Sequence, residues 1–215
     1  AEVPLGGDSV LDTGHELFHR DTGSGIACAS CHLEGAEDGR VWKFTPIGDR
    51  RTQSLDVGLA GTAPFHWDGD MGSFTTLMNE VFVHRMGGAA QSVDRNQALL
   101  DWVTQLTPPA RIREATDAAA LRGKAIFESS KASCSSCHAG QHHQSFFVGT
   151  TDATHPLQVP VLTGIGFRAP FMHNGCAPSL LGRFDPACGG GDRHGVTSHL
   201  TDAQKGDLIG YLESL

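Results

Sequence analysis

Two pentapeptides decide the fold of this chain: Cys-Ala-Ser-Cys-His at 28–32 and Cys-Ser-Ser-Cys-His at 134–138. Cys-x-x-Cys-His is the attachment signature of a c-type haem, whose porphyrin bonds to both thiols and whose iron takes the histidine as a ligand. Because a chain of 215 residues carries the pattern twice, we expect two covalently attached haems. The expected attachment residues are Cys28, Cys31, Cys134 and Cys137, and the expected proximal iron ligands are His32 and His138.

Two other chemistries use paired cysteines. Four thiolates could hold a structural zinc ion, and Cys-x-x-Cys is also the redox motif of thioredoxin-like domains. Zinc does not require a histidine after each second cysteine, and neither motif follows a convincing strand. Haem attachment is therefore favoured, and zinc is the principal alternative.

The two motifs belong to a longer internal repeat. The stretch Ala-Pro-Phe-His-Trp-Asp-Gly at 63–69 recurs as Ala-Pro-Phe-Met-His-Asn-Gly at 169–175, with the same offset of 106 residues as the haem motifs. Upstream, Gly14 and Phe18 recur as Gly123 and Phe127. This agreement indicates duplication of a haem-binding unit of about 100 residues, which is within the usual domain range.

The predicted boundary lies in the segment Thr107–Ala110, because its Pro-Pro pair cannot continue the preceding helix. We therefore predict an N-terminal cytochrome c domain over 1–109 and a C-terminal one over 110–215. Apolar spacing and capping residues predict helices at 9–19, from Ser73, at 96–106, at 116–129 and from Thr201. The expected fold is mainly α, with two tandem class I cytochrome c-like domains, each around one haem.

Composition limits the partners and the compartment. The net charge of −8 argues against nucleic acid as a partner, because nucleic-acid binding requires a basic surface. The sequence contains no run of about 18 apolar residues, the length that a membrane-spanning helix needs. Haem attachment takes place outside the cytoplasm, so we expect the bacterial periplasm or cell surface. Cys176 and Cys188 remain after haem attachment, and an oxidising compartment would pair them; two free thiols are the alternative.

The second axial ligand decides whether an iron is saturated or open to peroxide. In small cytochromes c it lies in the loop before the closing helix. That position holds Met86 in the first unit and His194 in the second, each beside glycines. Met86 could instead pack in the core, and Met172 and His199 are alternatives to His194. Six further histidines fall into two groups: His66, His84 and His173 could lie near a haem, and His142, His143 and His155 are expected to be solvated.

The haem motifs, the Phe-x-Trp-Asp-Gly element at 65–69 and the Ala-Pro-Phe-x-His-Asn-Gly element at 169–175 resemble the bacterial di-haem cytochrome c peroxidases. A relative of that family matures the tryptophan-derived cofactor of methylamine dehydrogenase. The resemblance spans nearly the whole chain. It implies that Trp67 lies between the two haems and helps to couple them, and that His173 matches the histidine of the family's C-terminal element. From the residues alone, Trp67 would be read as core packing.

The chain also departs from that family. Where the peroxidases carry a displaceable distal histidine, this chain has Asp49, and where they carry a catalytic Glu before a Met, it has Arg85. An arginine cannot accept a proton at working pH. The family's methionine on the C-terminal haem falls at Pro186-Ala187-Cys188, where no methionine is present.

These features favour an electron-transfer cytochrome whose two haems differ in potential, with a small redox protein as donor or acceptor. Met ligation raises the potential of an iron relative to ligation by two histidines, so the first haem would be the higher-potential centre. The alternative is a peroxidase-like enzyme that reduces hydrogen peroxide at the first haem. In that case His84 or His66 would replace the missing Glu as the proton shuttle.

Overall fold

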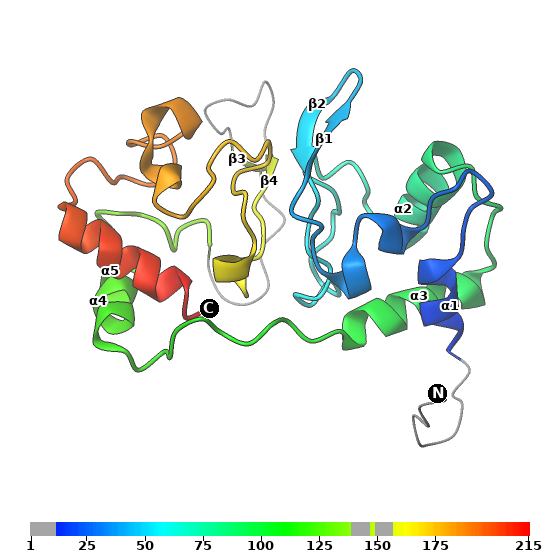
Figure 1. Ribbon diagram of the computed structural model, residues 1–215, viewed down its shortest axis with the longest axis horizontal. Coiled ribbons are helices and arrows are strands. Elements are labelled where there is room, and N and C mark those ends of the chain that lie inside the picture. The colour runs from blue at the N-terminus through cyan, green and yellow to red at the C-terminus, as the bar shows by residue number, and fades with distance from the viewer. Residues whose placement is uncertain (1–11, 139–146, 149–156) are drawn as a thin grey trace, which may run out of the picture.

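The computed structural model describes residues 12–138, 147–148 and 157–215. Figure 1 shows α1, α2 and α3 on one side and α4 and α5 on the other, joined by an extended segment, with two short hairpins between them. The helices are α1 (Thr13–His19), α2 (Phe74–Leu77), the π-helix η3 (Met78–Arg85), α3 (Val93–Gln105), α4 (Ala118–Phe127) and α5 (Asp202–Leu212). The 3-10 turns are η1 (Cys28–Ser30), η2 (Leu33–Gly35), η4 (Ile165–Phe167), η5 (Gly182–Phe184) and η6 (Pro186–Cys188).

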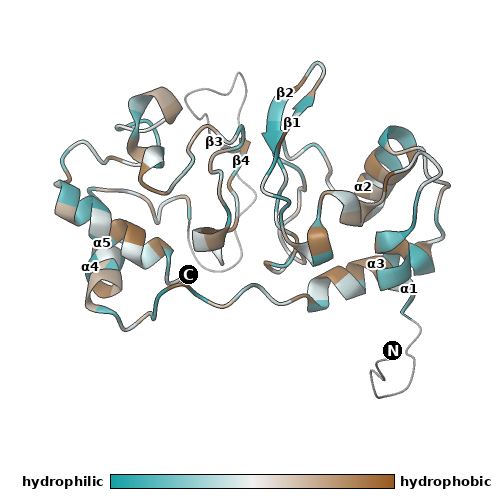
Figure 2. Ribbon diagram, viewed as in Figure 1, coloured by the Kyte–Doolittle hydropathy of each residue, from teal (hydrophilic) through white to brown (hydrophobic). Residues whose placement is uncertain are grey.

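Capping residues set most of the helix starts. Ser73 Oγ accepts from the Thr76 amide at 3.1 Å, and Thr201 forms the predicted capping box with Gln204. Asp12 caps α1, and residues 9–11 of that predicted helix lie outside the described residues. Figure 2 shows apolar and polar residues together on α3 and α5, as expected of helices with one buried face. No helix of the described residues is long and apolar enough to cross a membrane.

Each half contains one pair of closely crossing helices. A Cβ added at Gly14 of α1 would lie 2.3 Å from the Ala98 carbonyl oxygen of α3. A Cβ at Gly123 of α4 would lie 1.9 Å from the Asp207 carbonyl oxygen of α5. Only glycine allows the two backbones to approach this closely. The repeat of Gly14 at Gly123 is therefore a repeat of a helix crossing.

Two separate hydrophobic clusters accompany these crossings. We call them the N-terminal core, which includes Leu17, Phe18, Met78, Phe82, Leu99 and Val103, and the C-terminal core, which includes Phe127, Ile165, Phe171, Leu200, Leu208 and Leu212. Neither cluster contains residues of the other half. The boundary at residue 109 and the class I cytochrome assignment stay predictions.

Two antiparallel hairpins were not expected from the sequence. β1 (Val41–Phe44) pairs with β2 (Gly48–Arg51), and β3 (Phe147–Val148) pairs with β4 (Leu157–Gln158). All four residues of β1 are exposed, so the strand lacks the alternation of buried and exposed residues by which a strand is recognised. Its partner β2 nevertheless ends at the buried Arg51, which belongs to the site described below.

The two copies of the seven-residue repeat have the same backbone. Phe65 N donates to Met71 O at 2.8 Å, and Phe171 N donates to Ala177 O at 2.7 Å. The next residue has a positive φ in both copies, 78° at His66 and 69° at Met172. Non-glycine residues with such φ values are uncommon and are concentrated at functional sites.

A disulfide follows the second copy. Cys176 and Cys188 are bonded, with their Cα atoms 5.7 Å apart. The predicted pairing is therefore present. It ties the end of the repeat to η6 within the C-terminal half.

Candidate functional site

Each Cys-x-x-Cys-His motif opens onto a cavity. The N-terminal cavity is lined by Cys28, Cys31 and His32 and has a volume of about 1140 Å³. The C-terminal cavity is lined by the second motif and has a volume of about 160 Å³. Sites for small molecules and cofactors usually enclose about 300–1000 Å³. The N-terminal cavity is therefore large enough for a cofactor, whereas the side chains around the narrower C-terminal cavity would have to move apart to admit one.

His32 is fixed in the orientation that a metal ligand needs. Its Nδ1 lies 2.9 Å from the Gln53 carbonyl oxygen, which can only accept, so Nδ1 carries the proton and Nε2 keeps its lone pair. Burial lowers the pKa of His32 to about 4, so the imidazole is neutral at ordinary pH. Hydrogen bonds of this kind orient metal-bound histidines in many proteins.

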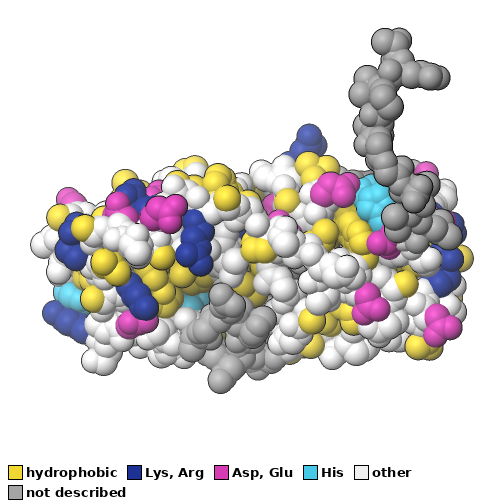
Figure 3. All heavy atoms as spheres, turned by 90° about the horizontal axis from the view of Figure 1, so that it is seen from below, with side chains coloured by type: hydrophobic (Ala, Val, Ile, Leu, Met, Phe, Trp, Pro, Cys, Tyr) yellow, Lys and Arg dark blue, Asp and Glu magenta, His cyan; other side chains and the backbone are white. Residues whose placement is uncertain are grey.

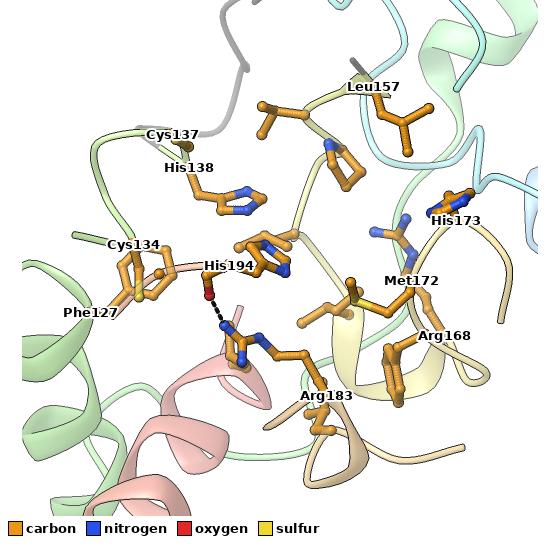
Figure 4. Close-up of a pocket in the computed structure, with 18 of the residues that line it drawn as sticks. Phe127, Cys134, Cys137, His138, Leu157, Arg168, Met172, His173, Arg183 and His194 are labelled. Carbon is orange, nitrogen blue, oxygen red and sulfur yellow. Dashed lines mark hydrogen bonds between the residues drawn. The ribbon is translucent and has the colours of Figure 1, made fainter. Parts of the chain in front are cut away.

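In the C-terminal cavity, His138 is accompanied by a second histidine. The rings of His138 and His194 have centroids 6.0 Å apart and planes inclined by 41°. Figure 4 shows both rings in the same pocket, with Arg183 donating to the carbonyl oxygen of His194. The contact fixes the segment that carries His194. The structure thus brings the predicted proximal and distal residues of the second unit together.

The N-terminal cavity contains the other predicted distal residue. Met86 is the C-cap residue directly after the π-helix η3 and lines this cavity together with His32. The π-type bond from Met86 N to Val81 O, at 2.9 Å, positions it there. His66 lines the same cavity and pairs with Asp70 at 3.1 Å. Burial, the largest influence, lowers the pKa of His66.

The other sequence candidates differ in their distance from the cavities. The side chain of His84 is 66% exposed and pairs with Glu80, and Asp49 is exposed on β2. Arg85 lines the N-terminal cavity, and Met172 lines the C-terminal one, whereas His199 is on neither lining. His142, His143 and His155 lie outside the described residues.

Trp67 lies between the two cavities and lines both. Its indole N–H donates to the Arg51 carbonyl oxygen at 2.9 Å, and its ring meets that of His173 edge-on, with centroids 6.3 Å apart. His173 is buried and lines the C-terminal cavity. The coupling of two haems that the resemblance implied for Trp67 stays a prediction, and these contacts also suit core packing.

A buried ionic cluster adjoins this tryptophan. Arg51 and Arg168 both pair with Glu37, and Arg168 Nε lies 2.7 Å from the Glu37 carboxylate. Arg51 also donates to the carbonyl oxygens of Arg168 and Pro170, at 2.7 and 2.6 Å. These bonds hold the two halves together. Two guanidinium groups facing one carboxylate leave a net positive charge in the wall shared by the cavities.

These two arginines were not predicted from the sequence. Arg51 and Arg168 are 117 residues apart in the chain, and neither belongs to a recognised motif. The one signal was position: Arg168 directly precedes the second copy of the repeat, whereas the first copy follows Thr62. Because the repeat does not share the arginine, its symmetry could not identify it.

Three buried arginine nitrogens lining the cavities have no partner among the described residues: Arg50 Nε, Arg51 Nε and Arg183 Nη1. A buried N–H group without a hydrogen-bond acceptor is costly, and a carboxylate is the best planar match for a guanidinium group. A haem brings two propionate carboxylates. The thiols, the oriented His32 and these arginines therefore fit a haem in the N-terminal cavity, and the second pair of thiols, His138 and Arg183 offer the same chemistry in the narrower C-terminal cavity.

No protein family model matches the chain. Among curated proteins, the gamma subunit of hydrazine synthase from Kuenenia stuttgartiensis is 23% identical over 88% of this chain and 72% of its own length. A solved structure of Kuenenia stuttgartiensis hydrazine synthase under xenon pressure has a TM-score of 0.75, with 20% identity over 94% of this chain and 86% of the other.

Two further solved structures are similar. A MauG-like protein associated with microbial copper homeostasis has a TM-score of 0.68, with 18% identity over 99% of this chain and 91% of the other. The diheme peroxidase BthA of Burkholderia thailandensis has a TM-score of 0.61, with 17% identity over 93% of this chain and 84% of the other. The chain therefore shares its fold with diheme peroxidase and MauG-like proteins.

Proposed function

We propose that the chain is an extracytoplasmic di-haem c-type cytochrome that transfers electrons between redox partners in the bacterial periplasm. The observation that carries this proposal is the wall containing Trp67, which lines both cavities. Two cofactors placed in these cavities would be separated by one layer of side chains. A bound haem iron supplies one-electron oxidation and reduction.

The chain's own residues would supply attachment, ligation and charge compensation. The two Cys-x-x-Cys pairs would attach the porphyrins, His32 and His138 would be the proximal ligands, and Met86 and His194 the distal ones. The spacing of His138 and His194 supports this assignment. The ring centroids are 6.0 Å apart, which would leave room for one metal bonded to a nitrogen of each imidazole, since such bonds are about 2 Å long.

Unequal distal ligands would give the two centres different roles. A methionine ligand raises the reduction potential of an iron relative to two histidines, so the N-terminal centre would hold an electron more strongly. Electrons would then pass from the C-terminal to the N-terminal centre past Trp67. The chain has a net charge of −8, and Figure 3 shows acidic side chains interspersed with basic ones on the face that it draws. The acidic excess suits a small redox protein with a basic face as the partner.

A second candidate function is reduction of hydrogen peroxide at the N-terminal haem. Its support is His66, which lines that cavity, is paired with Asp70 and has a pKa lowered by burial. A neutral imidazole there has a nitrogen that can take up a proton. Of the two shuttle residues predicted from the sequence, His84 is exposed on the outside of η3 and is the poorer candidate.

Stopped-flow mixing of the reduced holoprotein distinguishes the two functions. An electron carrier is oxidised quickly by a small oxidised redox protein and slowly by hydrogen peroxide, without steady turnover. Fast, saturable peroxide turnover that falls about 10²–10⁴-fold in His66→Ala, and is unchanged in the control His84→Ala, would establish the peroxidase and reject the carrier.

A further inference from the structure

Three metal-binding side chains meet on the surface of the N-terminal half, away from both cavities. His15 and His19 lie one turn apart on α1, and Glu34 lies in η2. One ligand atom from each of the three lies within 4.8 Å of the others. We propose that these three residues bind one divalent transition-metal cation, for which Zn²⁺ is the best-matched probe.

The distances between the donor atoms suit a shared ion. His19 Nε2 lies 2.6 Å from Glu34 Oε1, and His15 Nε2 lies 3.9 Å from Glu34 Oε2. Ligands bonded to zinc at about 2.0–2.2 Å are roughly 3–4 Å from one another, so small side-chain rotations suffice. In the structure the space between His19 and Glu34 is bridged by a hydrogen bond. A cation would replace the bridging proton.

Local sequence places the three donors together. Residues four apart on a helix share one face, which puts both imidazoles on the same side of α1. Glu34 has φ 49° and ψ 35° inside η2, a left-handed conformation that is rare for a residue other than glycine. Such a conformation costs free energy and is held where the surroundings require it. Here it accompanies the contact between Glu34 and α1.

The histidine rings are already oriented. His19 Nδ1 lies 3.0 Å from the His15 carbonyl oxygen, so Nδ1 donates and Nε2 faces Glu34. Metal-binding histidines commonly make this kind of bond with their second nitrogen. Trp102 of α3 packs edge-on against both rings, with centroids 5.4 Å from His15 and 6.2 Å from His19. The indole therefore restricts the rotation of both imidazole rings.

The ligand set and its exposure indicate the class of cation. Two neutral imidazoles and one carboxylate form the protein ligands of several zinc sites, in which water completes the coordination. The side chains of His15, His19 and Glu34 are 51%, 34% and 69% exposed, which leaves room for that water. Mixed nitrogen and oxygen donors favour zinc or copper over calcium or magnesium. Zinc is redox-inert, so it does not exchange electrons with haem.

The chain offers a natural control. His84 and Glu80 also lie four residues apart on one helix and approach to 3.6 Å. Among the described residues, the one cluster of three metal-binding groups is that of His15, His19 and Glu34. The pair on η3 thus has the same chemistry without a third donor, and it should not bind the ion measurably.

A bound ion would tie α1 to the haem motif, because Glu34 follows the iron ligand His32 by two residues. Any ligand that binds only the folded state raises the midpoint of unfolding in proportion to the logarithm of its concentration. Zinc should therefore stabilise the N-terminal half. This effect is separate from electron transfer and holds whether or not the proposed function does.

The test is calorimetric titration of untagged holoprotein with Zn²⁺, together with an anomalous map at the zinc edge of a zinc-grown crystal. Each of His15→Ala, His19→Ala and Glu34→Gln should weaken binding at the site by at least about tenfold and abolish the stabilisation by zinc. His84→Ala should bind like the wild type. Unchanged zinc binding in the three variants, or an anomalous peak only elsewhere, would overturn the proposal. The haem absorption spectrum confirms that each variant is folded.

Discussion

The segments Phe65–Met71 and Phe171–Ala177 share a backbone and differ in the side chains that face the cavities. Both close the same bridge, and both hold a non-glycine residue at a positive φ. That residue is His66 in the first and Met172 in the second. The following residue is Trp67 in the first and His173 in the second. The comparison shows that the two copies share one backbone geometry and differ in the chemistry of their side chains.

The divergence continues at the predicted distal ligands. Met86 reaches the first cavity from a π-helix, and His194 reaches the second from a loop fixed by Arg183. Unequal distal ligands on two centres would give them different reduction potentials, and a difference in potential is what directed electron transfer needs.

The largest expected effect is the loss of one haem. Cys28→Ser with Cys31→Ser should leave one covalent haem per chain, held by the second motif, because each cavity has its own pair of thiols. The matched variant, Cys134→Ser with Cys137→Ser, should also leave one covalent haem per chain, held by the first motif. Haem content is measured after acid extraction of the denatured protein. Free haem in the wild-type extract, or zinc in its place, would contradict covalent attachment.

The next effect concerns the distal ligands. Met86→Ala should abolish the near-infrared charge-transfer band expected of a sulfur–iron bond and convert the first haem to high spin. His194→Ala should convert the second haem and leave the first unchanged. If His66→Ala and Met172→Ala produce these changes instead, then the repeat supplies the distal ligands and the assignment of Met86 and His194 is wrong.

The helix crossings should be similarly sensitive in both halves. Gly123→Ala forces a Cβ to within 1.9 Å of a backbone oxygen, and Gly14→Ala to within 2.3 Å, so the helices must separate. Overpacking of this kind lowers the free energy of unfolding by about 1–3 kcal/mol, and we expect both variants to fall near the upper end of that range. Gly206→Ala, where nothing lies within 4 Å, should stabilise α5 by roughly 0.5–1 kcal/mol. Denaturant unfolding measures all three, and equal stability of Gly123→Ala and the wild type would refute the packing argument.

The smallest effect is expected at the wall between the cavities. Trp67→Phe keeps an aromatic ring but leaves the Arg51 carbonyl oxygen without its donor, at a cost of about 1 kcal/mol. Electron exchange between the haems should slow, as followed by pulse radiolysis. Trp102→Phe, on α3, is the control and should leave the rate unchanged. An unchanged rate in Trp67→Phe would show that this side chain only packs.

Much of this arrangement was predictable from local sequence. The haem motifs, the repeat and the caps at Ser73 and Thr201 each depend on residues close together in the chain, so a pattern reveals them. The cluster of Glu37, Arg51 and Arg168 was not predictable, because it forms only when distant segments fold together. The hairpin β1–β2 was missed because its exposed strand has no alternation.

The central claim is tested most directly by the low-temperature EPR spectrum of the fully oxidised holoprotein. The account predicts two different low-spin iron signals of equal intensity, one for a His/Met centre and one for a centre with two histidines, and no high-spin signal. A high-spin signal equal to one iron per chain would show that one haem has an open coordination site. That result would contradict the electron-carrier account.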